Sequence, residues 1–108
     1  MADHLGDFEQ LVMLAVLRLD ADAYGTSIRD ELKARAEREV SPGAIFTTLE
    51  RLESRGLVTS RYGEPTPERG GRSKRYYKLS AEGRRSLARS LRAVRRLMQG
   101  LEPTLERS

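Results

Sequence analysis

The hydrophobic and polar positions of residues 41–56 predict a short amphipathic helix with both of its ends marked. Ser41 can accept hydrogen bonds from the first backbone N–H groups, and Pro42 fits the first turn, where no N–H is needed. Gly56 follows the last turn, where a left-handed residue commonly ends a helix. The face predicted to pack on the core is apolar: Ile45, Leu49 and Leu52, with Phe46 on its flank.

The opposite face of this helix is small at its start, then hydroxylated, then cationic. Its residues are Gly43, Ala44, Thr47, Arg51, Ser54 and Arg55. A helix face turned only to solvent would more often carry Lys/Glu pairs along its length. This composition instead favours close approach to a partner, and we interpret the helix as one that enters the major groove of DNA.

Two helices are predicted before it. Residues 7–19 are apolar on almost every side, with Asp7 as the expected cap and Gln10 completing a capping box. One flank should meet the chain's own core and the other a second copy; the alternative is a central core helix of a monomer. Residues 24–38 repeat Tyr24, Ile28 and Leu32 at four-residue spacing and predict the first helix of a helix-turn-helix pair.

Residues 57–79 predict a β-hairpin. Two runs of β-branched and aromatic residues, 57–62 and 74–79, flank a loop that is rich in Gly, Pro and Arg. We expect Tyr77 and Leu79 to point inward. The basic limb of the loop is predicted to contact phosphate or a minor groove, although a solvated loop tip remains open: Arg69, Gly70, Gly71, Arg72, Lys74 and Arg75.

The last predicted helix spans residues 80–102, capped by Ser80 and stopped by Pro103, with residues 103–108 as a tail. Its apolar positions are spaced 4, 3, 4 and 3: Leu87, Leu91, Val94, Met98 and Leu101. A seam this narrow suits pairing with another helix. Together with Leu11 and Leu14 it forms the predicted dimer interface, and the alternative is an amphipathic helix lying on its own domain.

Composition narrows the function. The chain has 108 residues, no Cys and one His, so thiolate metal sites and His/Cys catalysis are excluded, and we expect neither an enzyme nor a cofactor. No apolar run could span a membrane and the N-terminus is not a signal peptide, so we expect a cytoplasmic protein. Residues 69–98 carry eleven basic side chains and one acidic, whereas residues 1–32 carry seven acidic and two basic. Such segregation predicts an anionic partner, nucleic acid first and an acidic membrane surface second; the alternative is a surface that only keeps the chain soluble.

Several strings resemble the PadR family of bacterial transcriptional regulators. They are the segments 5–15, 23–28, 40–53, 56–58 and 75–80, with Gly83, and they extend over nearly the whole chain. The resemblance implies a homodimeric winged-helix repressor, in which residues 41–55 enter the major groove and the last helix crosses the first helix of the partner. It also implies a small aromatic effector at the dimer interface in some members. The chain lacks the Trp that is prominent in some drug-binding members and has Phe46 where the family often has Tyr.

The predicted fold is therefore mainly α with a small β-hairpin: a winged helix-turn-helix domain over residues 1–79 and a dimerisation helix over 80–102. We expect Ala44, Thr47 and Arg51 at base edges of a palindromic operator in double-stranded DNA. Phosphate contacts are expected from the helix start and from flanking positions: Ser41, Gly43, Thr48 and Arg55. Two other functions stay open, a nucleic-acid-binding protein without sequence preference and a winged helix that binds only protein.

Overall fold

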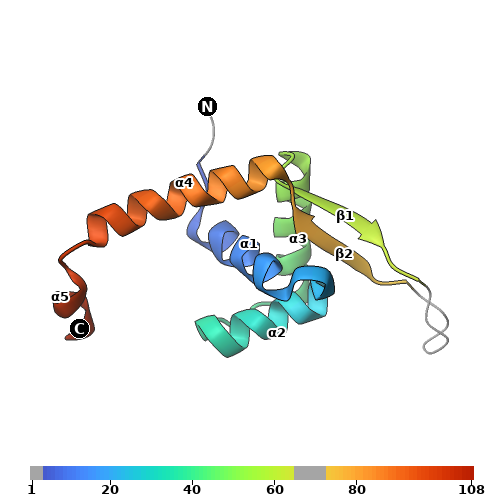
Figure 1. The fold of residues 1–108 in the computed structure, drawn as a ribbon. Helices are drawn as coiled ribbons and strands as arrows, with labels where there is room; N and C mark the ends of the chain where they lie inside the picture. The colour runs from blue at the N-terminus through green and yellow to red at the C-terminus, as the bar shows by residue number, and fades with distance from the viewer. Residues whose placement is uncertain (1–3, 65–72) are drawn as a thin grey trace.

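The computed structural model describes residues 4–64 and 73–108, and it folds as a winged helix with a long C-terminal helix (Figure 1). The elements follow in the order α1 (Asp7–Leu19), the 3₁₀ turn η1 (Asp20–Asp22), α2 (Gly25–Ala36), α3 (Pro42–Ser54), β1 (Val58–Tyr62), β2 (Arg75–Leu79), α4 (Ala81–Met98) and α5 (Glu102–Glu106). The mainly helical fold with one hairpin is as the sequence predicts.

α1 is the centre of the domain, and it contacts α2, α3 and β2. Val12, Met13 and Val16 of α1 are buried together with the apolar rows of the neighbouring helices. The rows predicted for α2 and α3 are confirmed as core: Ile28, Leu32, Ile45, Leu49 and Leu52 are all buried. The helix-turn-helix pair is therefore held against α1 by side chains that the 3.6-residue period of each helix places on one face.

The ends of α1 and α2 differ from the predictions. Gly6, and not Asp7, caps α1, and the Gly6 N–H donates to Oε1 of Glu9 at 2.9 Å. Gln10 instead donates from Nε2 to the Leu5 carbonyl at 3.4 Å. Tyr24 is the N-cap of α2, which ends at Ala36 instead of residue 38 because Glu37 adopts a left-handed conformation with φ 54°. The sequence offers no Gly or Asn there to signal this ending.

The ends of α3 are as predicted. The Ser41 hydroxyl accepts the Ala44 N–H at 3.1 Å, and Pro42 occupies the first turn. Gly56 has φ +76°, in the left-handed region that glycine adopts without strain. The Leu57 N–H then donates to the Leu52 carbonyl at 2.9 Å, which turns the chain directly into the hairpin.

The hairpin pairs β1 with β2 in antiparallel register from Val58 opposite Leu79 to Tyr62 opposite Arg75. Tyr77 and Leu79 are buried, as the alternation predicts. The Tyr77 N–H also donates to the carbonyl of Ala23 at 2.9 Å, so the base of the hairpin is tied to the start of α2. The wing is thereby held beside the helix-turn-helix pair.

α4 begins as predicted and ends early. The Ser80 hydroxyl accepts the Gly83 N–H at 2.9 Å. The helix ends at Met98, and Gly100 follows with φ +86°. Pro103 does not stop α4; it lies in the first turn of α5, a short helix in the segment predicted as a tail. Figure 1 shows that the C-terminal half of α4 extends away from the other helices.

Candidate nucleic-acid interface

The outward face of α3 is a stripe of four exposed residues spaced 4, 3 and 4 apart. They are Gly43, Thr47, Glu50 and Ser54. This stripe lies opposite the buried row of Ile45, Leu49 and Leu52, because residues at this spacing share one side of an α-helix. Its members are short except for Glu50, so another molecule could approach the backbone of α3 closely along most of the helix.

Glu50 is not among the DNA contacts predicted from the sequence, which include the neighbouring Arg51 and Arg55. At about 100° per residue, Glu50 is nearer the middle of the exposed face than Arg51, which belongs to a flank. The spacing of Gly43, Thr47 and Ser54 would have located Glu50 had acidic side chains been considered.

Thr48 does not fit its predicted contact with the DNA backbone. Its exposed fraction is 4%, and it faces the core with Ile45 and Leu52. Residues three and four apart share a face, and Thr48 follows Ile45 by three positions and precedes Leu52 by four. Thr48 is therefore part of the packing of α3 and is excluded as a contact in this conformation.

The start of α3 carries small side chains. Ser41, Gly43 and Ala44 are all exposed. The Ser41 side chain already accepts the Ala44 N–H, so this hydroxyl serves the helix cap. The N-terminus of a helix attracts anions because its first N–H groups point outward and its dipole is positive there.

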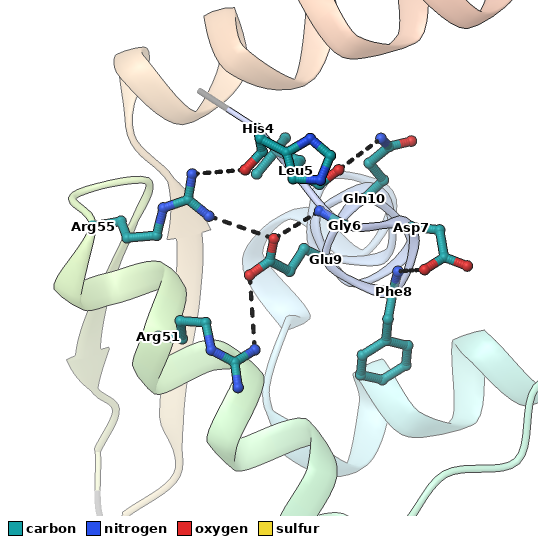
Figure 2. A network of polar contacts seen from close by, with 9 residues as sticks. All are labelled: His4, Leu5, Gly6, Asp7, Phe8, Glu9, Gln10, Arg51 and Arg55. Atoms are coloured by element: carbon teal, nitrogen blue, oxygen red, sulfur yellow. Dashed lines mark hydrogen bonds and ion pairs between the residues drawn. The ribbon is translucent and has the colours of Figure 1, made fainter. Parts of the chain in front are cut away.

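Arg51 and Arg55 lie on the flank of α3 that faces the start of α1, where both meet one carboxylate (Figure 2). The Glu9 side chain is only 12% exposed; its Oε2 lies 3.7 Å from Nη1 of Arg51, and its Oε1 lies 3.4 Å from Nη1 of Arg55. Arg55 also donates from Nη2 to the His4 carbonyl at 2.9 Å. Arg51 remains about half exposed, so it can turn from Glu9 to a partner without unfolding anything.

Arg75 was expected to contact phosphate, but the structure gives it another role. Its Nη2 lies 2.7 Å from Glu53 Oε1, its Nε donates to Ser60 Oγ at 3.1 Å, and the side chain is 28% exposed. Nη1 lies 3.7 Å from Oε2 of Glu50. These bonds fasten the start of β2 to the side of α3, so Arg75 sets the position of the wing and is not a free cation for DNA.

Burial lowers the pKa of Arg75, but the electrostatic effects of Tyr77 and Glu53 leave it raised overall, so the guanidinium stays charged. For the neighbouring Tyr77 hydroxyl, burial raises the pKa, and the positive charge of Arg75 opposes this change. Neither group therefore changes its charge near neutral pH, and the contact between wing and α3 should be insensitive to pH in that range.

A groove of roughly 360 Å³ separates the wing from the starts of α2 and α3. Its lining includes Tyr24, Phe46, Tyr62 and Lys74. Phe46 is 52% exposed, and Nζ of Lys74 lies 4.3 Å from the centroid of the Tyr24 ring. Lys74 is exposed and so keeps its predicted access to a phosphate backbone, whereas Phe46 and Tyr62 were not predicted as surface features. The remaining wing residues of the prediction lie outside the described residues: Arg69, Gly70, Gly71 and Arg72.

The predicted dimer residues divide into three groups. Leu87 is buried in the core of the single chain and is unavailable to a partner, which corrects that assignment. Leu11, Leu14 and Leu91 are partly buried against the same core. The rest of the seam is exposed along α4 and just beyond it: Val94, Met98 and Leu101. Leu97, which is 80% exposed, joins this surface and was missed because it lies outside the heptad spacing.

Residues 4–64 and 73–108 hold no group of three or more His, Cys, Asp or Glu side chains that could bind a metal ion. Within the same residues, none of the helices combines the length and hydropathy needed to cross a bilayer.

Comparison with known proteins agrees with the fold. The model of the transcriptional regulator PadR-like family matches residues 13–89. Transcriptional regulator Rv3488 of Mycobacterium tuberculosis is 35% identical over 78 residues, which are 72% of this chain and 68% of that protein.

Solved structures give the same result. A PadR family regulator from Eggerthella lenta is 28% identical, with a TM-score of 0.67 over 92% of this chain and 84% of the other. A PadR family regulator from Clostridium difficile shares the fold at 23% identity, with a TM-score of 0.71 over 91% of this chain and 98% of the other. The chain belongs to the PadR-like family, whose members are DNA-binding transcriptional regulators and not enzymes.

Proposed function

We propose that the protein is a homodimeric repressor that acts in the cytoplasm and binds a palindromic operator in a sequence-specific way. The observation that carries the proposal is the outward stripe of α3, which is free of bulky side chains over most of its length. The stripe is presented by a helix whose other sides contact α1, α2 and β1. α3 has 13 residues, and the major groove of DNA is wide enough to admit an α-helix.

Each protomer would read bases with the exposed side chains of α3. Thr47 lies in the middle of the stripe, and Ala44 and Arg51 lie on its flank. Arg51 would exchange the Glu9 carboxylate for the O6 and N7 atoms of guanine, a bidentate contact that Arg commonly makes. Ser41 and Gly43 would place the start of α3 against a phosphate.

Most of the general affinity for DNA would come from elsewhere. Lys74 and the wing residues Arg69, Gly70, Gly71 and Arg72 would follow the phosphate backbone beside the major groove. Arg55 would add a backbone contact at the end of α3, on the side where it meets Glu9.

The exposed part of α4 supports the dimer. Val94, Leu97 and Met98 lie on a helix whose second half extends away from the domain, and they are exposed in the single chain. A second copy would bury them, together with the exposed Leu17 of α1. The same two-fold contact would set the two α3 helices about 34 Å apart, one turn of DNA.

Repression requires no surface beyond those described, because a dimer bound across an operator blocks access of other proteins to that DNA. Release by a small aromatic effector would follow if the effector bound between α1 and α4 of the two copies and changed the separation of the α3 helices. A ligand that binds the DNA-competent and the released dimers equally would have no effect.

The test is selection of binding sites from random duplexes with the purified protein. We expect a palindrome whose half-sites are separated by about 10 base pairs from centre to centre. Binding without enrichment of any sequence would favour a nucleic-acid-binding protein without base preference. A complete lack of salt-dependent binding would favour a winged helix that binds only protein.

A further inference from the structure

Glu50 is an acidic residue in the middle of a surface that is proposed to face an anion. It shares the outward stripe of α3 with Gly43, Thr47 and Ser54. The side chain is 50% exposed, and at about 100° per residue it lies on nearly the opposite side of α3 from Ile45 and Leu52. A helix in the major groove would therefore carry this carboxylate toward the base edges.

The contacts of Glu50 leave its carboxylate available. It forms a long ion pair with Arg75, with 3.7 Å between Oε2 of Glu50 and Nη1 of Arg75. The same guanidinium makes much closer contacts with Glu53 at 2.7 Å and with Ser60 at 3.1 Å. The distant pairing with Arg75 keeps Glu50 on the wing side of the stripe without consuming its hydrogen-bonding capacity, because each carboxylate oxygen can accept more than one bond.

A carboxylate in the major groove is compatible with few base edges. Guanine presents two acceptors there, and adenine presents the N7 acceptor beside its N6 amino donor, whereas cytosine presents only the N4 amino donor. An ionised carboxylate can only accept, so it is repelled by the guanine edge and by nearby phosphates unless an amino group donates to it. A Glu at this place should thus reduce binding to most sequences and favour those with cytosine opposite it.

We propose that Glu50 is a specificity-determining residue that accepts a hydrogen bond from the N4 amino group of one cytosine in each half-site, with Arg75 as its positioning residue. This inference rests on the proposed function, because it requires α3 to lie in the major groove. α3 would then read two bases: Arg51 selects guanine on the α1 side, and Glu50 selects cytosine on the wing side of the stripe.

The experiment repeats the selection from random duplexes with wild type, Glu50→Gln and Glu50→Ala. Glutamine pairs with the N6 and N7 atoms of adenine, so Glu50→Gln should shift one base pair per half-site from cytosine to adenine. Glu50→Ala should lose the preference there, by about 5- to 150-fold in relative affinity, a range set by contacts of 1–3 kcal/mol. Both variants should bind random duplexes more tightly than wild type.

The matched control is Glu82→Gln on α4, which removes the same charge from a side chain that is 48% exposed and paired with Arg85 at 2.9 Å. It should leave the selected sequence unchanged. A Glu50→Gln motif identical to that of wild type would overturn the inference and leave the proposed function standing. A wild-type selection without any motif would overturn the proposed function itself.

Discussion

Gly83 packs against the backbone of Leu57 near the start of α4, and Gly83→Ala tests how closely these two segments pack. A Cβ atom built at Gly83 would lie 1.9 Å from the carbonyl oxygen of Leu57 and 2.9 Å from its carbonyl carbon. Ordinary contacts of a Cβ begin near 3.4 Å. Relief would therefore require a shift of more than 1 Å between α4 and the turn after α3.

Such a shift would break contacts on both sides. The Leu57 carbonyl accepts the Ser80 N–H at 3.0 Å, and the Ser80 hydroxyl donates to the Gly56 carbonyl at 2.7 Å. The obstacle is the backbone of the buried Leu57 and not the end of a flexible side chain. We expect Gly83→Ala to lower the free energy of unfolding by about 2 kcal/mol or more, within the range for overpacked cores. The melting temperature should fall by about 10 °C.

The assay is urea denaturation at several protein concentrations, since the proposed dimerisation would make the apparent stability depend on concentration. The control is Gly25→Ala at the start of α2, where no atom lies within 4 Å of an added Cβ. The control should be at least as stable as wild type, because Ala loses less backbone entropy than Gly on folding. A Gly83→Ala protein within about 0.5 kcal/mol of wild type would refute the close packing of α4 on Leu57.

Four further changes test the interface and its supports. Arg51→Ala should relax the preference at one base pair by about 1–3 kcal/mol, measured by competition between operator variants; an equal loss on all sequences would refute base reading by Arg51. Glu9→Gln keeps an acceptor for the Gly6 N–H but frees Arg51 from its ion pair, so affinity for the operator should rise, and unchanged affinity in a titration would contradict that release. Leu97→Glu should dissociate the dimer in sedimentation experiments while the circular dichroism spectrum stays helical; an intact dimer would exclude this surface. Ser41→Ala should lower the free energy of unfolding by about 1 kcal/mol through loss of the α3 cap, and no change in the denaturation midpoint would argue against the bond to Ala44.

The parts of the fold that depend on local chemistry could be predicted from the sequence. Ser41, Pro42 and Gly56 mark the ends of α3 through their own side chains and backbone freedom, and the structure confirms all three. The buried row of α3 follows from helical spacing alone. Periodicity and turn residues also predict the order of the elements, which the structure confirms. The resemblance to the PadR family is confirmed by the family match over residues 13–89.

The parts that depend on distant contacts could not be predicted in this way. Arg75 belongs to a basic run in the sequence, and only the folded chain brings it to Glu53, 22 residues earlier. Leu87 continues a heptad spacing, yet it is buried in the core of the single chain and is unavailable to a partner. Thr48 is a different case, because its spacing of three residues from Ile45 already places it on the core face, where it is buried.

The ends of helices without a marked residue were also beyond prediction. Glu37 ends α2 in a left-handed conformation that Glu seldom adopts. Pro103 was expected to stop α4, but a proline is as compatible with the first turn of a helix as with the residue after one, and here it starts α5. The local sequence carries no such signal at the end of α2, whereas Gly100, with φ +86°, marks the end of α4.

The central claim is that two copies of α3 are presented one turn of DNA apart, and a distance between the two copies tests it directly. Because the chain has no Cys, Thr47→Cys provides a single site for a spin label near the middle of α3. Pulsed electron–electron double resonance on the free protein should give a distribution of label-to-label distances centred at about 34 Å and broadened by the flexibility of the label. A signal without dipolar modulation would show that the protein is not a dimer, and a distribution centred below about 20 Å or above about 50 Å would contradict the proposed spacing of the recognition helices.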